Sequence, residues 1–191
     1  MPAPRVVSLL PSATEVVALA GGADVLVGRS HECDYPDVSA LPTLTAANND
    51  FTSSAQMNDA VAMSLEAGKG LYSLNSDLLR KLRPDVIVTQ DLCAVCAVDL
   101  AAVERATEGS ANIVCLYPFS ILDVLDDIRR VGRALGSEDR ARAEADQLSR
   151  RIDAASKLAK QCAVGLPAAP KVCSWRCALC AARQELQIKL E

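Results

Sequence analysis

The stretch Arg5-Val-Val-Ser-Leu-Leu-Pro-Ser-Ala-Thr-Glu15 combines a strand with the beginning of a helix. Its apolar run Val6–Leu10 stops at Pro11, which is typical of a short buried strand. Ser12 and Glu15 follow with the spacing of a capping box, in which each side chain bonds the backbone N–H of the other residue. We therefore expect a helix to begin at Ser12. A strand that leads directly into a helix favours an α/β fold.

The same alternation continues along the chain. Short apolar runs predict strands at about 6–10, 25–29, 86–89 and 112–116, and most of the intervening segments have helical patterns. The polar segment from about Asn48 to Leu82 is expected to be helical, with interruptions at Gly68 and Gly70. Strands that alternate with helices form a parallel sheet with right-handed crossovers, so we predict a Rossmann-like α/β lobe.

Two helices follow the last strand. Ser120 can cap the first helix, Gly136 ends it, and Asp126 and Arg130 are spaced for an ion pair on its polar side. Its apolar positions form one stripe: Leu122, Leu125, Ile128, Val131 and Leu135. The second helix, Glu138–Cys162, would be about 37 Å long and would connect the lobe to the rest of the protein.

Composition and charge exclude several classes of protein. Half of the residues are hydrophobic and 23% are charged, as in a soluble globular protein. The net charge of −4, without a basic cluster, argues against a nucleic-acid-binding surface. The sequence has neither a secretion signal nor an apolar run near the ~18 residues that a membrane span requires. We expect a cytoplasmic protein whose cysteines are reduced.

Chemistry-bearing residues gather in the loops that follow predicted strands, where ligands bind in parallel α/β sheets. His31, the single histidine, stands beside Glu32 and Cys33. Cys93-Ala-Val-Cys96 has the spacing of a redox pair or of half a zinc site. If neighbouring strands bring the two loops together, a four-ligand zinc site is stereochemically conceivable from His31, Cys33, Cys93 and Cys96. The alternative is that these cysteines only pack the loops.

No arrangement for catalysis is visible. The single histidine has no serine nucleophile in a strained elbow, and no phosphate-binding P-loop exists. We therefore predict that the protein is not an enzyme. Three readings stay open: a small-ligand binding module, a cytosolic metal- or thiol-dependent protein that uses the histidine and three cysteines named above, and an inactive truncated product.

Several motifs recur in an order that resembles a known family. Arg5–Glu15, Val27-Gly28 and Cys33-Asp-Tyr-Pro36 are similar to the opening of the vitamin B12-binding class of periplasmic substrate-binding proteins, the class III proteins with a helical backbone. Lys81-Leu-Arg-Pro-Asp-Val-Ile-Val88 matches the start of one of the family's strands. The combination of His31–Pro36 with Thr89–Ala97 resembles a signal-less cytosolic subgroup of cobalamin-binding proteins. The resemblance covers about residues 5–172.

The resemblance implies a domain order. Family members are clamps of two α/β lobes joined by one long helix, with the ligand between the lobes. The N-terminal ligand-binding lobe would be residues 1–136 and the connecting helix residues 137–165. Residues 166–191 would be a remnant of the second lobe or an aberrant tail. We thus expect the second lobe to be missing and the chain to be truncated after the connecting helix.

The ligand implied by the resemblance is cobalamin, or a related corrinoid or metal chelate, held by loops at the carboxyl ends of strands. The residues expected to contact it are His31, Glu32, Tyr35, Gln90 and Asp91. Zinc, held by the histidine and the three cysteines named above, is the other candidate cofactor. The lack of a secretion signal speaks against a membrane permease, which is the family's usual partner.

Overall fold

The structure, a computed structural model, describes residues 2–48, 53–66, 70–90, 98 and 100–163. By its contacts the chain divides into two units, Met1–Arg150 and Arg151–Glu191. The elements in chain order are β1 (Val6–Ser8), α1 (Pro11–Leu19), a 3-10 turn η1 (Ala23–Val25), β2 (Leu26–Gly28), β3 (Thr45–Ala47), α2 (Ser54–Glu66), β4 (Tyr72–Leu74), α3 (Ser76–Leu82), β5 (Val86–Gln90), α4 (Leu100–Thr107), β6 (Asn112–Leu116), α5 (Ile121–Leu135) and α6 (Glu138–Ala163). The first unit contains everything up to residue 150 of α6.

Four of the strands form one parallel sheet in the order β2-β1-β5-β6. Val6 of β1 pairs with Leu26 of β2 on one side and with Val86 of β5 on the other, and Val86 pairs with Asn112 of β6. The predicted strands and their parallel pairing are therefore confirmed. β1 and β2 are shorter than expected, and β5 extends one residue further, to Gln90.

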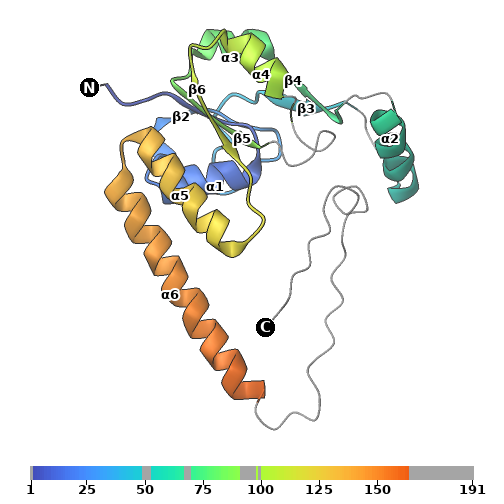
Figure 1. The fold of residues 1–191 in the computed structure, drawn as a ribbon. Helices are drawn as coiled ribbons and strands as arrows, with labels where there is room; N and C mark the ends of the chain where they lie inside the picture. Colours follow the sequence, from blue (N-terminus) through green and yellow to red (C-terminus); the bar gives the residue numbers. More distant parts are fainter. Residues whose placement is uncertain (1, 49–52, 67–69, 91–97, 99, 164–191) are drawn as a thin grey trace. The chain divides into compact units, whose positions relative to one another are not determined.

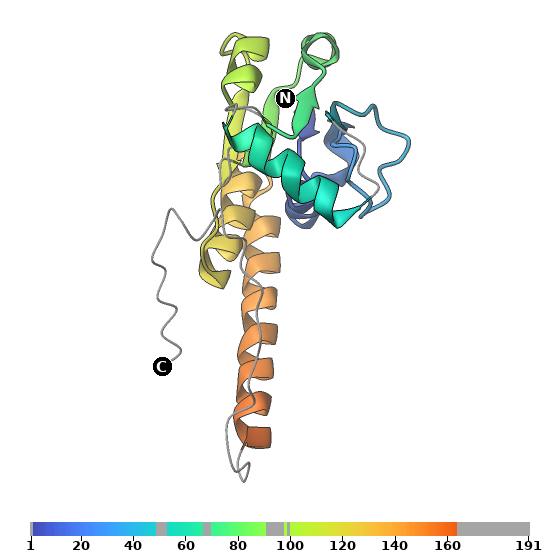
Figure 2. The ribbon, with the colours of Figure 1, turned by 90° about the vertical axis from the view of Figure 1, so that its right-hand side faces the viewer.

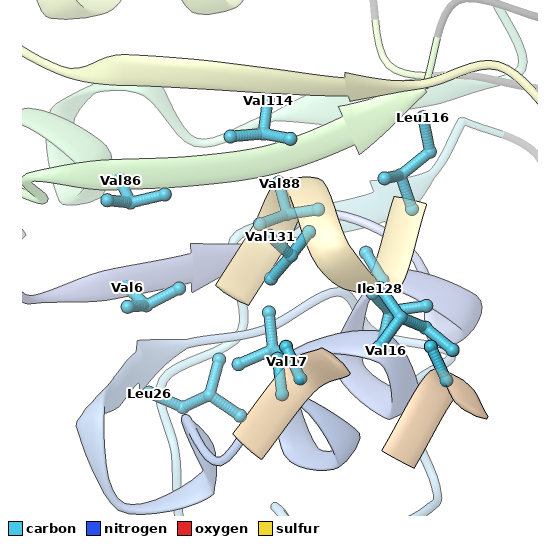
Figure 3. Packing of buried hydrophobic residues seen from close by; sticks show 14 of the residues in the cluster. Val6, Val16, Val17, Leu26, Val86, Val88, Val114, Leu116, Ile128 and Val131 are labelled. Atoms are coloured by element: carbon cyan, nitrogen blue, oxygen red, sulfur yellow. The ribbon is translucent and has the colours of Figure 1, made fainter. Parts of the chain in front are cut away.

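Helices cover both faces of this sheet (Figure 1). α1 and α5 contact each other on one face, and α3 and α4 contact each other on the opposite face. Because successive strand residues point to opposite faces, Val6 and Val88 pack with α1 and α5 (Figure 3). Their neighbours Val7 and Ile87 pack in a second cluster with α3 and α4. Burial on both faces explains why these strands are continuous apolar runs.

The predicted capping box at Ser12 and Glu15 is wrong. α1 begins at Pro11, and its N-cap residue is Leu10, which makes no side-chain capping bond. Proline is favoured at the first helical position because its missing N–H would have no helical partner there. Thr14, which lies between Ser12 and Glu15 in the sequence, is fully buried, and its hydroxyl forms a hydrogen bond of 2.7 Å with Ser8 Oγ of β1.

The segment from Asn48 to Leu82, expected to be helical with interruptions at Gly68 and Gly70, contains two helices with a strand between them in its described part. β4 pairs antiparallel with β3 and forms a second, two-stranded sheet. Three residues are too few for an alternating pattern to stand out in the sequence. Backbone bonds fix this small sheet beside the loop after β2: the Leu44 N–H donates to the Arg29 carbonyl, and the Asn75 N–H donates to the Leu44 carbonyl, each at 2.8 Å.

Ser120 caps α5 as predicted. Its hydroxyl accepts the Asp123 N–H at 3.2 Å, and the Asp123 carboxylate accepts the Ser120 N–H at 2.8 Å. The Ser120 side chain, followed by the Phe119 N–H, lowers the pKa of Asp123.

Two predictions about the faces of α5 are wrong. Leu122 is 69% exposed instead of buried, while Leu125, Ile128 and Val131 do face the core. Steps of three residues fall short of the 3.6-residue turn, so a stripe with that spacing slides around the helix and its first member turns outward. Asp126 pairs with Arg129, three residues later, at 2.7 Å, because Arg130 pairs with the buried Asp127 instead.

α5 and the first part of α6 form a hairpin whose helices lie side by side (Figure 2). Gly136 closes it with a positive φ of 73°, a conformation that glycine adopts without strain. An Arg129–Asp146 ion pair of 2.9 Å links the two helices. In α6, Ala141 and Ala145 are buried. The described side chains from 151 to 162, which lie in the second unit, are exposed. No helix in the described ranges is long and apolar enough to span a membrane.

Asp127 is a buried acid on α5. Its side chain is 5% exposed, Oδ1 accepts from Arg130 at 2.7 Å, and Oδ2 is without a well-formed hydrogen bond. Burial raises the pKa of Asp127, and the positive charge of Arg130 offsets only part of that effect. The folded chain therefore holds this proton more tightly than the unfolded chain. The contribution of Asp127 to stability is greatest below the ordinary pKa of aspartate and is lost as the pH rises through the folded pKa.

We expect Asp127→Asn to raise the free energy of unfolding at neutral pH, because the amide is buried without the cost of a charge. The gain should shrink toward acid pH, where the wild-type carboxyl takes up its proton. Urea unfolding at a series of pH values checks this. Asp126→Asn is the matched control, because its exposed side chain should matter by less than about 0.5 kcal/mol at neutral pH. An equal gain from Asp127→Asn at every pH would contradict the charge-burial explanation.

Candidate functional site

A cavity of about 310 Å³ opens at the carboxyl ends of β1, β2 and β5. Its lining comes from the β1–α1 turn, the loop after β2, the small β3–β4 sheet and the end of β5, together with Val98. Parallel strands present their carboxyl ends at one edge, and the loops there diverge to leave a hollow. The cavity therefore lies where the sequence predicted a ligand.

His31 is held against β3 by a single threonine. Its ring Nδ1 lies 2.6 Å from Thr45 Oγ1, and its backbone N–H donates to the same oxygen at 3.0 Å. The side chain is 26% exposed and lines the cavity. Because both the backbone and the ring are fixed by one buried group, the imidazole has a defined direction at the cavity wall.

Glu32 and Tyr72 complete this part of the wall. Tyr72 Oη donates to Glu32 Oε1 at 3.5 Å, and that oxygen lies 3.9 Å from His31 Nε2. The rings of Tyr72 and His31 have centroids 5.4 Å apart and are tilted by 54°. The β3–β4 sheet thus supports the histidine from two sides, through Thr45 on β3 and Tyr72 on β4.

The predicted ligand-binding residues separate into three groups. His31, Glu32 and Gln90 all line the cavity, and Gln90 does so from the last position of β5. Tyr35 is 69% exposed and is not among the cavity-lining residues. Asp91 lies outside the described residues.

The predicted zinc ligands are only partly described. Cys33 is buried in the core cluster below the cavity, where Thr14 Oγ1 donates to its sulfur at 3.0 Å. It does not line the cavity that His31 lines. Cys93 and Cys96 lie outside the described residues, so the four-ligand site stays a prediction. In the part of the chain that is described, no group of three or more His, Cys, Asp or Glu side chains is placed to hold a metal ion.

Three cavity residues of this wall were not predicted individually: Ser30, Thr45 and Tyr72. Ser30 had a weak signal, since it falls within the loop after a predicted strand. Thr45 and Tyr72 had none, because they belong to the β3–β4 sheet that the sequence pattern does not reveal.

Neither a protein-family model nor a curated protein matches the sequence. Solved structures do match the fold. BtuF, the periplasmic vitamin B12 binding protein of Vibrio cholerae, superposes with a TM-score of 0.59 at 20% identity, over 80% of this chain and 49% of its own. A periplasmic heme binding protein from Pseudomonas aeruginosa gives a TM-score of 0.58 at 19% identity, over 83% and 48%. The periplasmic heme-binding protein RhuT from Roseiflexus gives 0.59 at 22% identity, over 88% and 53%.

The chain shares its fold with about half of each of these binding proteins. At these identities the likeness concerns architecture, and it confirms the predicted parallel α/β lobe followed by a long helix. The chain spans about half the length of these binding proteins. All three are named for small ligands that contain a chelated metal, vitamin B12 or heme.

Proposed function

We propose that this chain binds cobalamin or a related metal chelate in the cavity described above, as a binding module with no catalytic role. The observation that carries the proposal is the setting of His31. Its Nδ1 is engaged by Thr45, while Nε2 remains as the ring nitrogen at the cavity wall. A ligating histidine is commonly fixed through its other nitrogen in this way.

A chelated metal requires fewer protein ligands than a bare ion does. A closed zinc site needs four protein ligands and an open one needs three, whereas the described residues offer no such group. A corrinoid or porphyrin ring already fills the four equatorial positions of its metal. The protein then needs to supply only an axial ligand, for which a histidine is a common choice.

The size and lining of the cavity fit one wall of such a site. A volume of about 310 Å³ is at the lower end of the range for small-molecule pockets. A chelate of this class would lie against this wall, where His31 is the residue that would ligate its metal. Gln90 and Ser12 would offer hydrogen bonds to the amide or carboxylate groups at the rim of the ring. The names of the structurally similar binding proteins point to the same class of ligand.

Titration of the purified chain with a panel of ligands tests the proposal. The panel is hydroxocobalamin, hemin, metal-free protoporphyrin and zinc ion, with binding followed by equilibrium dialysis and visible absorbance. We expect at least one metal chelate to bind with one ligand per chain and with a shifted absorption band, since imidazole replaces an axial ligand of the metal. Metal-free protoporphyrin should bind more weakly. Binding of zinc alone, or of no panel member, would contradict the proposal.

A further inference from the structure

Thr45 has a central position in the site. It is 5% exposed on β3, and its hydroxyl oxygen contacts three polar groups. It accepts the His31 backbone N–H at 3.0 Å and lies 2.6 Å from His31 Nδ1. Its own proton is directed to Ser30 Oγ at 3.1 Å, and Ser30 Oγ also accepts the Glu32 N–H at 3.3 Å.

The number of protons available indicates which ring nitrogen of His31 donates and which accepts. A threonine hydroxyl has one proton to donate and two lone pairs to accept with. With that proton directed to Ser30 Oγ, Thr45 accepts in both of its contacts with His31. In this arrangement Nδ1 carries a proton. In a neutral imidazole only one nitrogen is protonated, which leaves Nε2 with its lone pair.

We infer that Thr45 is a positioning residue that holds neutral His31 in the tautomer with the proton on Nδ1, so that Nε2 presents a lone pair to the cavity. The tautomer is argued from the hydrogen-bond directions around Thr45, whereas its consequence for ligands rests on the proposed function. An Nε2 lone pair can bind a metal centre that has an open axial position. It disfavours a ligand that places only a hydrogen-bond acceptor opposite Nε2, because two lone pairs would then face each other.

Glu32 favours the opposite tautomer, but from beyond hydrogen-bond distance. Nε2 makes no hydrogen bond to a described residue, and the Glu32 carboxylate stands 3.9 Å from it. Tyr72 supports the ring by a tilted contact and directs its hydroxyl to Glu32. Thr45 contacts Nδ1 at hydrogen-bond distance, so its contact outweighs that of Glu32 in assigning the proton.

The tautomer can be read directly, because the chain contains a single histidine. We would label histidine with ¹⁵N and record the two ring-nitrogen shifts of the ligand-free protein at a pH where the ring is neutral. The expected spectrum has a protonated Nδ1 and an unprotonated Nε2. Thr45→Val, which keeps the shape and removes the hydroxyl, should shift the populations toward a protonated Nε2. Thr45→Ser should keep the wild-type spectrum. A wild-type protein with its proton on Nε2, or a Thr45→Val spectrum equal to wild type, would overturn the inference.

Ligand binding provides the second measurement. For the chelate that binds wild type, Thr45→Val should lower the affinity about 10- to 100-fold, the usual effect of removing a residue that orients a metal ligand. Thr45→Ser should restore most of it. Equal affinities in wild type and Thr45→Val would overturn the positioning role. If no chelate binds wild type, the proposed function fails while the nitrogen shifts still decide the tautomer, so the two failures are distinguishable.

Discussion

His31→Ala should abolish the shift in visible absorbance that a metal chelate undergoes when it binds this chain, and should weaken its binding by at least about tenfold. Removal of a residue that only orients a metal ligand already lowers metal affinity about 10- to 100-fold. His31→Ala removes the ligand itself. One decade in affinity corresponds to about 1.4 kcal/mol. Difference spectra and equilibrium dialysis with the same chelate measure both effects.

The control for this experiment is Tyr35→Ala. Tyr35 was also predicted as a ligand contact, but its side chain is exposed and is not part of the cavity lining. We expect the variant to bind as wild type does. A His31→Ala protein that still shifts the absorption band would show that another group ligates the metal. Equal losses in the two variants would point to damage to the loop after β2 instead of to the loss of a ligand.

Gly132→Ala should destabilise the first unit strongly. A Cβ at this position would lie 2.1 Å from the Cβ of Ala141, a separation that no change of rotamer can relieve. The two helices of the α5–α6 hairpin must move apart, and overpacking of this kind costs about 1 to 3 kcal/mol or more. Alanine regains about 1 kcal/mol of helix propensity, and a clash this close belongs at the upper end of the overpacking range, at about 3 kcal/mol, so the net loss should be about 2 kcal/mol. Urea unfolding followed by circular dichroism measures it.

A second substitution separates the clash from other causes. Ala141→Gly removes the atom that Gly132→Ala would strike, so the double variant should recover to within about 1 kcal/mol of wild type. Ala145→Gly is the matched control: Ala145 is equally buried on α6, but is not among the atoms near Gly132. It should give no rescue. Equal recovery with either glycine would mean that α6 does not pack against α5 as described.

The main sheet could be predicted because its evidence is local. The runs at 6–10, 86–89 and 112–116 are apolar without alternation, and each is followed by a helical pattern, so both faces of the sheet must be covered. The N-terminus of α1 was misplaced because Ser12 and Glu15 have the right spacing for a cap while Pro11 has the better geometry for the first helical position. A sequence pattern does not rank such competing local solutions.

The candidate site was predictable only in part. His31, Glu32 and Gln90 were found because each follows a strand at the edge where ligands bind. Tyr35 stands in the same loop yet turns to solvent, since a loop has no periodicity from which the direction of a side chain can be inferred.

The sequence by itself determined that this protein is a parallel α/β lobe with a long helix after it, and that its single histidine stands at the edge of the sheet where the cavity lies. Both follow from patterns of residues close in the chain, although the strands themselves pair over long separations, as β1 does with β5. Only the tertiary structure decided what the histidine can do there. Thr45 is 14 residues from His31 along the chain, and Tyr72 reaches Glu32 from 40 residues away. The pairing of β3 with β4, which brings Thr45 and Tyr72 to the site, depends on the folded lobe to which backbone hydrogen bonds attach it. The contacts of the Thr45 hydroxyl, from which we infer the tautomer of His31, exist only after that pairing.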